Sequence, residues 1–146
     1  MKKTVKYLVI CLLSGVLVTL LSSSVVFKGW RAGDAEWMYV QIPEKYSYHK
    51  AFETAVDVLS EKYEMGVVDE NDHYVSTAWS FFHNAFGGVD KNSRSRVTLK
   101  FSKDGKRIAV KTEVQILLNH HWKDGYWDEY NRKICDRIQA ALDNNF

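Results

Sequence analysis

Residues 94–116 read RSRVTLKFSKDGKRIAVKTEVQI and indicate the architecture more directly than any other segment. Apolar and polar side chains alternate on both sides of Asp104-Gly105, which is the pattern of two half-buried antiparallel strands. A two-residue type I′ turn at Asp104-Gly105 fixes one register. The pairs in this register are Phe101 with Ile108, Leu99 with Val110, and Arg96 with Glu113. We therefore predict a β-hairpin with one apolar face and an ion pair on the other face.

The segments around the hairpin predict three further strands and two loops. Residues 36–42 and 65–68 are rich in β-favouring apolar side chains, and residues 74–81 alternate with a period of two. Residues 83–92 and 119–125 show neither the two-residue period of a strand nor the three- to four-residue spacing of a helix. Both segments contain glycine, so we expect loops there.

Two helices are predicted from apolar residues that recur every three or four positions. The first follows Ser47, a favourable N-cap, and its apolar stripe extends from Ala51 to Tyr63. The second extends from Trp127 to Leu142 and has acidic residues in its first turn, as the helix dipole favours. The order is β-α-β-β-β-β-α. This order predicts an α+β domain with a mostly antiparallel sheet and both helices on one face.

The N-terminal sequence predicts export or membrane attachment. Lys2, Lys3 and Lys6 precede residues 7–27, which carry no charge, and this combination is typical of a signal peptide or a single transmembrane anchor. If the segment is not cleaved, the lysines are expected to stay in the cytoplasm and residue 28 onward to lie outside. We divide the chain into a signal or anchor segment (1–24), a spacer (25–35) and one α+β domain (36–146).

Composition limits the function of the domain. Without residues 1–24 the chain has 17 basic and 18 acidic residues, and such a neutral domain is a poor candidate for binding nucleic acid. Cys11 lies in the apolar segment and Cys135 is alone in the domain, so we expect no disulfide within the domain.

A resemblance to a known class rests on two features. Leu21, Ser22 and Ser23 are similar to the lipobox of bacterial lipoproteins, although Ser24 occupies the position of the lipidated cysteine, so no thioether can form there. The element order over about residues 37–142 resembles the helix-grip domains of small bacterial envelope lipoproteins, such as the BamC subunit of the outer-membrane β-barrel assembly machinery. The resemblance implies a binding or scaffolding module without catalytic residues.

Two groups of side chains are candidates for partner binding. Aromatic residues in or beside the predicted loops suit a protein interface or a membrane headgroup region, or alternatively pack onto the core. These residues are Phe86, Trp122, Tyr126 and Trp127. Basic residues on the outer face of the hairpin suit an acidic partner or anionic lipid, or alternatively serve only solubility. These residues are Arg94, Arg96, Lys100, Arg107 and Lys111.

Evidence for chemistry in the sequence is sparse. His120, His121 and Asp124, with His83, are the available metal-ligating residues, but adjacent histidines seldom converge on one ion. No nucleophile elbow, phosphate-binding loop or HExxH motif is present, so we expect neither catalysis nor a cofactor.

The sequence therefore predicts a non-catalytic binding or scaffolding module of the bacterial cell envelope, which is periplasmic, membrane-tethered or secreted. Its expected partner is an envelope protein or a membrane surface. Two alternatives are a small periplasmic hydrolase or metal-dependent factor that uses the loop histidines, and a single-pass membrane subunit of a larger envelope complex.

Overall fold

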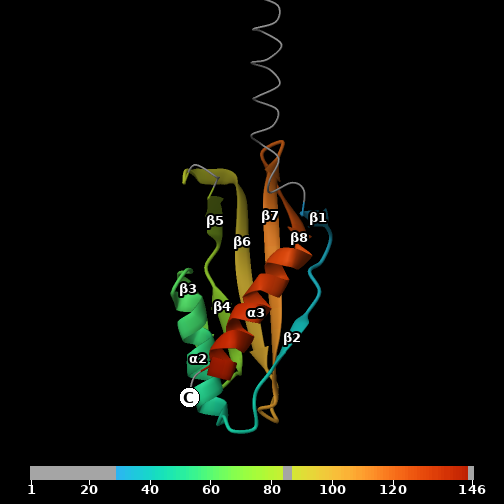
Figure 1. Cartoon of the computed structure of the whole chain (residues 1–146). Coiled ribbons are helices and arrows are strands. Elements are labelled where there is room, and N and C mark those ends of the chain that lie inside the picture. The colour runs from blue at the N-terminus through green and yellow to red at the C-terminus, as the bar shows by residue number, and fades with distance from the viewer. Residues whose placement is uncertain (1–28, 84–86, 145–146) are drawn as a thin grey trace, which may run out of the picture. The chain divides into compact units, whose positions relative to one another are not determined.

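A computed structural model describes residues 29–83 and 87–144 of the chain. The predicted signal or anchor segment, including Ser24, lies outside the described residues, and so does Phe86. Neither helix of the described part is long and apolar enough to span a bilayer. The described residues form, in order, β1 (Arg31–Ala32), β2 (Met38–Gln41), α2 (Tyr48–Ser60), β3 (Met65–Asp69), β4 (Tyr74–Thr77), β5 (Ser80–His83), β6 (Val89–Phe101), β7 (Arg107–Leu118), β8 (His121–Tyr126) and α3 (Asp128–Asn144) (Figure 1).

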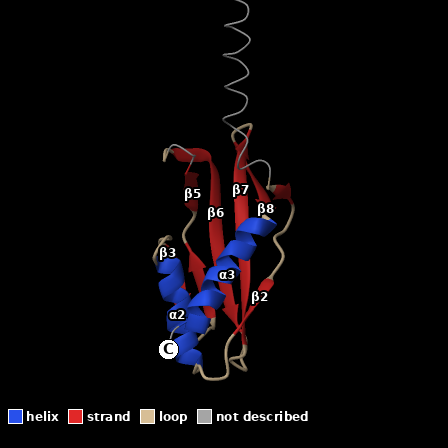
Figure 2. Ribbon diagram, viewed as in Figure 1, coloured by secondary structure: helices blue, strands red, loops and turns tan. Residues whose placement is uncertain are grey.

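The predicted α+β class and antiparallel sheet are confirmed, with eight strands instead of the expected five. The long strands β6 and β7 lie at the centre (Figures 1 and 2). The other edge of β6 pairs with β4 and β5, and the other edge of β7 pairs with β2 and β8. β3 continues the sheet beyond β4, and β1 continues it beyond β8. β1 therefore occupies part of the segment that was expected to be a spacer.

The predicted hairpin register is confirmed, but the predicted turn is wrong. Leu99 pairs with Val110 and Arg96 with Glu113. A type I′ turn needs a positive φ at both central residues, whereas only Gly105 of the Asp104-Gly105 pair has one, at 68°. The loop is wider because the Ser102 side chain organises it: its hydroxyl oxygen accepts hydrogen bonds from the backbone N–H groups of residues 106 and 107.

The predicted loop at residues 119–125 is also wrong. Asn119 and His120 have φ values of 49° and 64°, so they form a two-residue turn with both φ values positive, and β8 follows at once. Asn and His adopt this left-handed region more readily than most residues. β6 likewise begins at Val89, inside the predicted loop 83–92.

The strand predicted at residues 74–81 is divided into β4 and β5. Ala78 and Trp79 separate the two strands, and the Ala78 N–H donates to the Glu64 carbonyl at 2.8 Å instead of to β6. β4 pairs with residues 98–100 of β6, and β5 pairs with residues 89–95.

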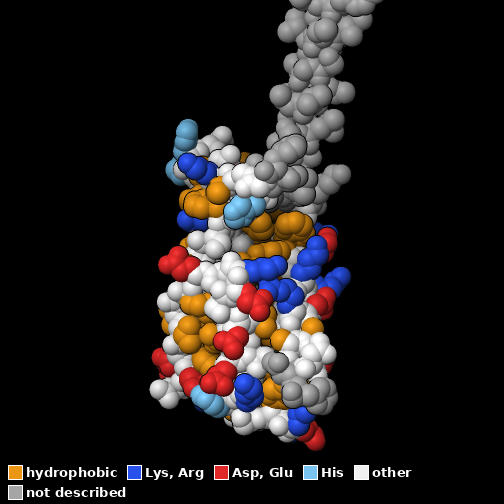
Figure 3. All heavy atoms as spheres, turned by 60° about the vertical axis from the view of Figure 1, so that its left-hand side comes forward, with side chains coloured by type: hydrophobic (Ala, Val, Ile, Leu, Met, Phe, Trp, Pro, Cys, Tyr) orange, Lys and Arg blue, Asp and Glu red, His pale blue; other side chains and the backbone are white. Residues whose placement is uncertain are grey.

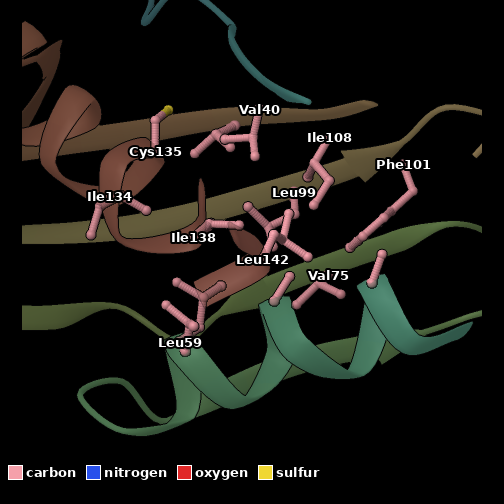
Figure 4. Packing of buried hydrophobic residues seen from close by; sticks show 14 of the residues in the cluster. Val40, Leu59, Val75, Leu99, Phe101, Ile108, Ile134, Cys135, Ile138 and Leu142 are labelled. Carbon is pink, nitrogen blue, oxygen red and sulfur yellow. The ribbon is translucent and has the colours of Figure 1, made fainter. Parts of the chain in front are cut away.

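Both predicted helices are confirmed, and they pack on the same face of the sheet (Figure 2). The Lys50 N–H donates to the hydroxyl of Ser47, which caps α2 as expected. Helix residues such as Leu59 and Ile138 meet strand residues such as Leu99 and Ile108 in one core (Figure 4). Full burial of a Leu or Ile side chain contributes about 1.5–3 kcal/mol to the stability of the fold. The apolar face of the strands therefore determines which side of the sheet the helices cover.

Candidate functional site

The face of the sheet opposite α2 and α3, here called the open face, carries the basic residues of the hairpin. Side chains alternate along a strand, so the neighbours of the buried core residues on β6 and β7 point away from the helices. The described residues provide no helix for this face. The basic residues of the hairpin on this face are Arg94, Arg96, Lys100, Arg107 and Lys111.

Aromatic residues from other segments lie on the open face beside these cations. Tyr39 of β2 pairs with Ala109, and Phe81 of β5 pairs directly with Arg94. Trp122 of β8 pairs with Leu117. The aromatic residues of the open face include Trp37, Tyr39, Tyr74, Trp79, Phe81 and Trp122.

Arg94 and Arg96 stack on the two indoles at the β5–β8 end of the open face. The Arg94 guanidinium carbon lies 4.1 Å from the Trp122 ring centroid and 4.8 Å from that of Trp79. The corresponding carbon of Arg96 lies 4.8 Å from the Trp79 centroid. Phe81 adds a further contact to Trp122, with their ring centroids 6.4 Å apart.

The other three cations also lie over rings. The Nζ atoms of Lys100 and Lys111 are 5.1 and 5.5 Å from the Trp37 centroid. The Arg107 guanidinium carbon is 5.3 Å from the Tyr39 centroid. All of these distances lie within the range of about 6 Å in which a cation is attracted to an aromatic face. Each of these five basic residues is therefore held against a ring.

Hydrogen bonds orient two of the guanidinium groups further. Arg96 donates from Nε and Nη2 to one Glu113 carboxylate oxygen, at 3.0 and 2.8 Å. Arg94 donates from Nε to the Gln115 side-chain oxygen at 2.8 Å. Lys111 lies 3.9 Å from the other Glu113 oxygen.

Three of the five cations form no direct ion pair within the described residues, although Arg107 interacts electrostatically with Asp104. Within residues 29–83 and 87–144, Arg94, Lys100 and Arg107 form no ion pair with a carboxylate. The open face therefore presents a positive surface to a ligand.

Charge is segregated between the central hairpin and the rest of the domain. Residues 89–118 hold eight basic and three acidic residues, whereas the rest of residues 25–146 holds nine basic and fifteen acidic residues. Figure 3 views the side of the molecule at β3 and α2, where acidic side chains lie around hydrophobic ones. The net charge of residues 25–146 is close to zero and therefore does not reveal this separation of basic from acidic residues.

The predicted partner-binding residues do not all lie together. Arg94, Arg96, Lys111 and Trp122 share the open face. Trp127 lies on the helix side instead, stacked on Tyr130 with a centroid distance of 5.8 Å.

Tyr126 lies on the same side of β8 as Trp122 and Asp124, in the part of the strand that pairs with β1, opposite Arg31. Phe86 lies outside the described residues. The open face, and not the two loops as a pair, is therefore the larger assembly of aromatic and basic side chains.

The weak metal candidates do not form a ligand set. His120 is in the β7–β8 turn, and His121 and Asp124 alternate to opposite faces of β8. Asp124 instead accepts a hydrogen bond from Gln115 at 2.6 Å. Across the described ranges, which include His83, no three His, Cys, Asp or Glu side chains are grouped so that they could hold a metal ion.

Sequence reasoning missed the aromatic half of the open face. Trp37 and Tyr39 were expected only as residues of a strand, and Trp79 and Phe81 only as part of an alternating strand. Their period-two spacing does indicate that each pair shares a face. The local pattern does not show that both pairs face the same cations, because this depends on pairing between distant strands.

A hollow with a volume of about 540 Å³ lies between α2 and the β3–β4 region. His49 lines it and lies 2.7 Å from a carboxylate oxygen of Glu70 and 3.3 Å from Glu53. The hydrogen bond to Glu70 is the main cause that raises the pKa of His49. The histidine is exposed and engaged by both carboxylates, so this hollow is a weaker candidate site than the open face.

The fold and the open face define a small α+β domain with a two-helix layer on one side and an aromatic, basic surface on the other. No model of a known protein family matches the chain, and no curated protein matches it. The functional conclusion therefore depends on the geometry and on the N-terminal sequence.

Proposed function

We propose that this chain is a non-catalytic binding module of the bacterial cell envelope and that it contacts another envelope component through the open face. The single observation that carries the proposal is the set of five cations, each held over an aromatic ring, on a face that neither helix covers. Binding surfaces are enriched in Trp, Tyr and Arg, which combine large contact area with directed charge.

The stacked arrangement favours binding because the side chains are ordered before a ligand arrives. A cation over an exposed ring gains about 0.5–1 kcal/mol, which restricts the motion of a long Arg or Lys side chain. A ligand then loses less conformational entropy when it contacts these groups. The same arrangement also offers hydrogen-bond donors at the edges of the guanidinium groups.

The location in the envelope is supported by the basic start and the apolar residues 7–27. We also propose that the domain is similar to the helix-grip domains of small envelope lipoproteins, as its element order suggests. Fractionation of a bacterial host, with mass measurement of the recovered chain, tests it. We expect the chain in the periplasmic or membrane fraction; a mature form that starts at Val25 indicates cleavage, and recovery of the full-length chain as a soluble cytoplasmic protein contradicts the proposal.

Binding through the open face is tested by co-sedimentation of the full chain, kept in mild detergent, with isolated bacterial envelopes. We expect Arg94→Ala and Trp122→Ala to reduce the bound fraction severalfold, because each removes one partner of the 4.1 Å stack. Arg132→Ala is the matched control, since Arg132 is exposed on α3. Equal binding by all three variants and the original chain would refute the role of the open face.

A further inference from the structure

The geometry points to an acidic polysaccharide, a glycan strand that carries carboxylate groups, as the ligand of the open face. This inference rests on the proposed function and names the ligand class of the same surface. Three properties of the open face support it: its length, its positive charge and the mixture of rings with cations.

The length favours an extended polymer over a small ion. Arg107 lies at one end of β7, and Arg94 pairs with Gln115 near the other end. Eight residues of strand separate positions 107 and 115, which corresponds to about 26 Å at about 3.3 Å per residue. Between these ends lie Lys100 and Lys111, both over Trp37. The cations thus form a row that a single small anion cannot occupy.

The charge favours an anionic strand. Arg94, Lys100 and Arg107 are distributed along this row, and none of them forms an ion pair with a carboxylate of the described residues. Acidic residues predominate elsewhere in the domain, so a polyanion is attracted to the hairpin and repelled by most of the remaining surface.

The rings favour a glycan among polyanions. A sugar ring has an apolar face of C–H groups that packs on an aromatic side chain, and Tyr39 and Phe81 are 56% and 43% exposed at the two ends of the row, although Arg107 also lies against Tyr39. Single-stranded nucleic acid is bound by a succession of bases that stack on several aromatic rings. Trp37, Trp79 and Trp122 each have a cation against the ring. This leaves less ring surface for such a succession than for two sugar contacts at Phe81 and Tyr39.

The same ring geometry disfavours a bilayer surface as the ligand. Aromatic side chains at a membrane interface place their apolar part among the lipids, which is harder for an indole that stacks on a guanidinium. A carboxylated glycan satisfies both groups at once, because its anionic groups meet the cations and its ring faces meet the exposed parts of Phe81 and Tyr39.

The test is a titration of the full chain in mild nonionic detergent, followed by tryptophan fluorescence, with polygalacturonate as the probe. Neutral dextran, a single-stranded thymidine oligonucleotide and vesicles with anionic phospholipid are the comparison ligands. We expect polygalacturonate to bind most tightly, to lose affinity as salt is added and to displace the chain from isolated envelopes. We expect no binding of dextran.

The double variant Lys100→Gln/Arg107→Gln removes two cations of the row that form no direct ion pair within the described residues, and it is expected to weaken polygalacturonate binding by about tenfold. The double variant Arg132→Gln/Lys133→Gln removes two exposed charges of α3 and is expected to bind as the original chain does. Unchanged circular dichroism confirms that both double variants fold. Equal weakening in both double variants would show that only net charge matters and would overturn the inference.

The outcomes separate the two levels of the proposal. Tighter binding of the oligonucleotide, the vesicles or dextran overturns the ligand class but leaves a binding function of the open face in place. Envelope binding that depends on Arg94 but is not displaced by polygalacturonate also overturns the ligand class alone. Envelope binding that is independent of Arg94 and Trp122 overturns the proposed function itself.

Discussion

At the scale of single residues, two buried threonines differ in whether their hydroxyl group has a hydrogen-bond partner within the described residues. Thr112 is 0% exposed, and within the described residues its hydroxyl oxygen has no hydrogen-bond partner. We expect Thr112→Val to raise the free energy of unfolding by about 1 kcal/mol, because a methyl group of similar size replaces an unsatisfied polar group. Denaturant titration measures the change.

Thr77 provides the matched control. It is 2% exposed, and its hydroxyl oxygen accepts a hydrogen bond from the Val97 N–H at 3.0 Å. Thr77→Val leaves this buried N–H without a partner and is expected to lower the free energy of unfolding by about 1–3 kcal/mol. If both variants are destabilised, the Thr112 hydroxyl has a favourable interaction after all.

The charge state of His49 is a second property of a single residue. Its pKa is raised above the ordinary value of 6.5, first by the hydrogen bond to Glu70 and further by the charges of Glu70 and Glu53. The stabilisation that the protonated histidine contributes is fully present below pH 6.5 and is lost as the pH rises through the raised pKa. We expect an NMR titration to show the raised value and Glu70→Gln to lower it. A pKa unaffected by Glu70→Gln would show that the 2.7 Å contact does not persist in solution.

At the scale of elements, the sequence was sufficient wherever the signal was local. The Ser47 cap and the apolar stripe after it placed α2, and alternation around residues 104–105 placed the register of β6 and β7. β8 was missed because Asn119-His120 lacks the glycine that usually marks a two-residue turn. β1 was missed because a strand of two residues has no period and exists only through its pairing with β8.

The same turn gives a prediction for the β7–β8 hairpin. His120 has a φ of 64°, which glycine adopts without steric strain, so His120→Gly is expected to raise the free energy of unfolding by about 0.5–1 kcal/mol. His121→Gly is the control: this residue lies in β8, where glycine weakens a strand, so a decrease is expected. Thermal unfolding of both variants measures the difference. A decrease for His120→Gly would mean that its side chain supports the turn.

At the scale of the whole molecule, the open face brings together residues that are far apart in the sequence. The basic residues were predicted because they alternate within one hairpin. The rings of Trp37, Trp79 and Trp122 come from three other segments, and their contacts with the cations follow from the order of strands in the sheet. Composition could not show this either, because the positive hairpin is balanced by an acidic remainder.

A substitution at Glu113 can distinguish the effect of local charge on envelope binding from the effect of the protein's net charge. The Glu113 carboxylate lies between two central cations of the open face, with ion pairs to Arg96 at 2.8 Å and Lys111 at 3.9 Å. Glu113→Gln removes the negative charge but keeps an oxygen that can accept from Arg96. We therefore expect this variant to bind isolated envelopes severalfold more tightly, with a steeper dependence on salt.

Asp136→Asn is the control for the Glu113 variant, because it changes the total charge by the same amount on the exposed surface of α3. Co-sedimentation at two salt concentrations compares the two variants. If the open face binds an anionic component, only Glu113→Gln strengthens binding, since the field of a surface charge falls off within about 10 Å at 0.1 M salt. Equal strengthening by both variants would assign envelope binding to total charge, and weaker binding of Glu113→Gln would mean that its carboxylate is needed mainly to hold Arg96 in place.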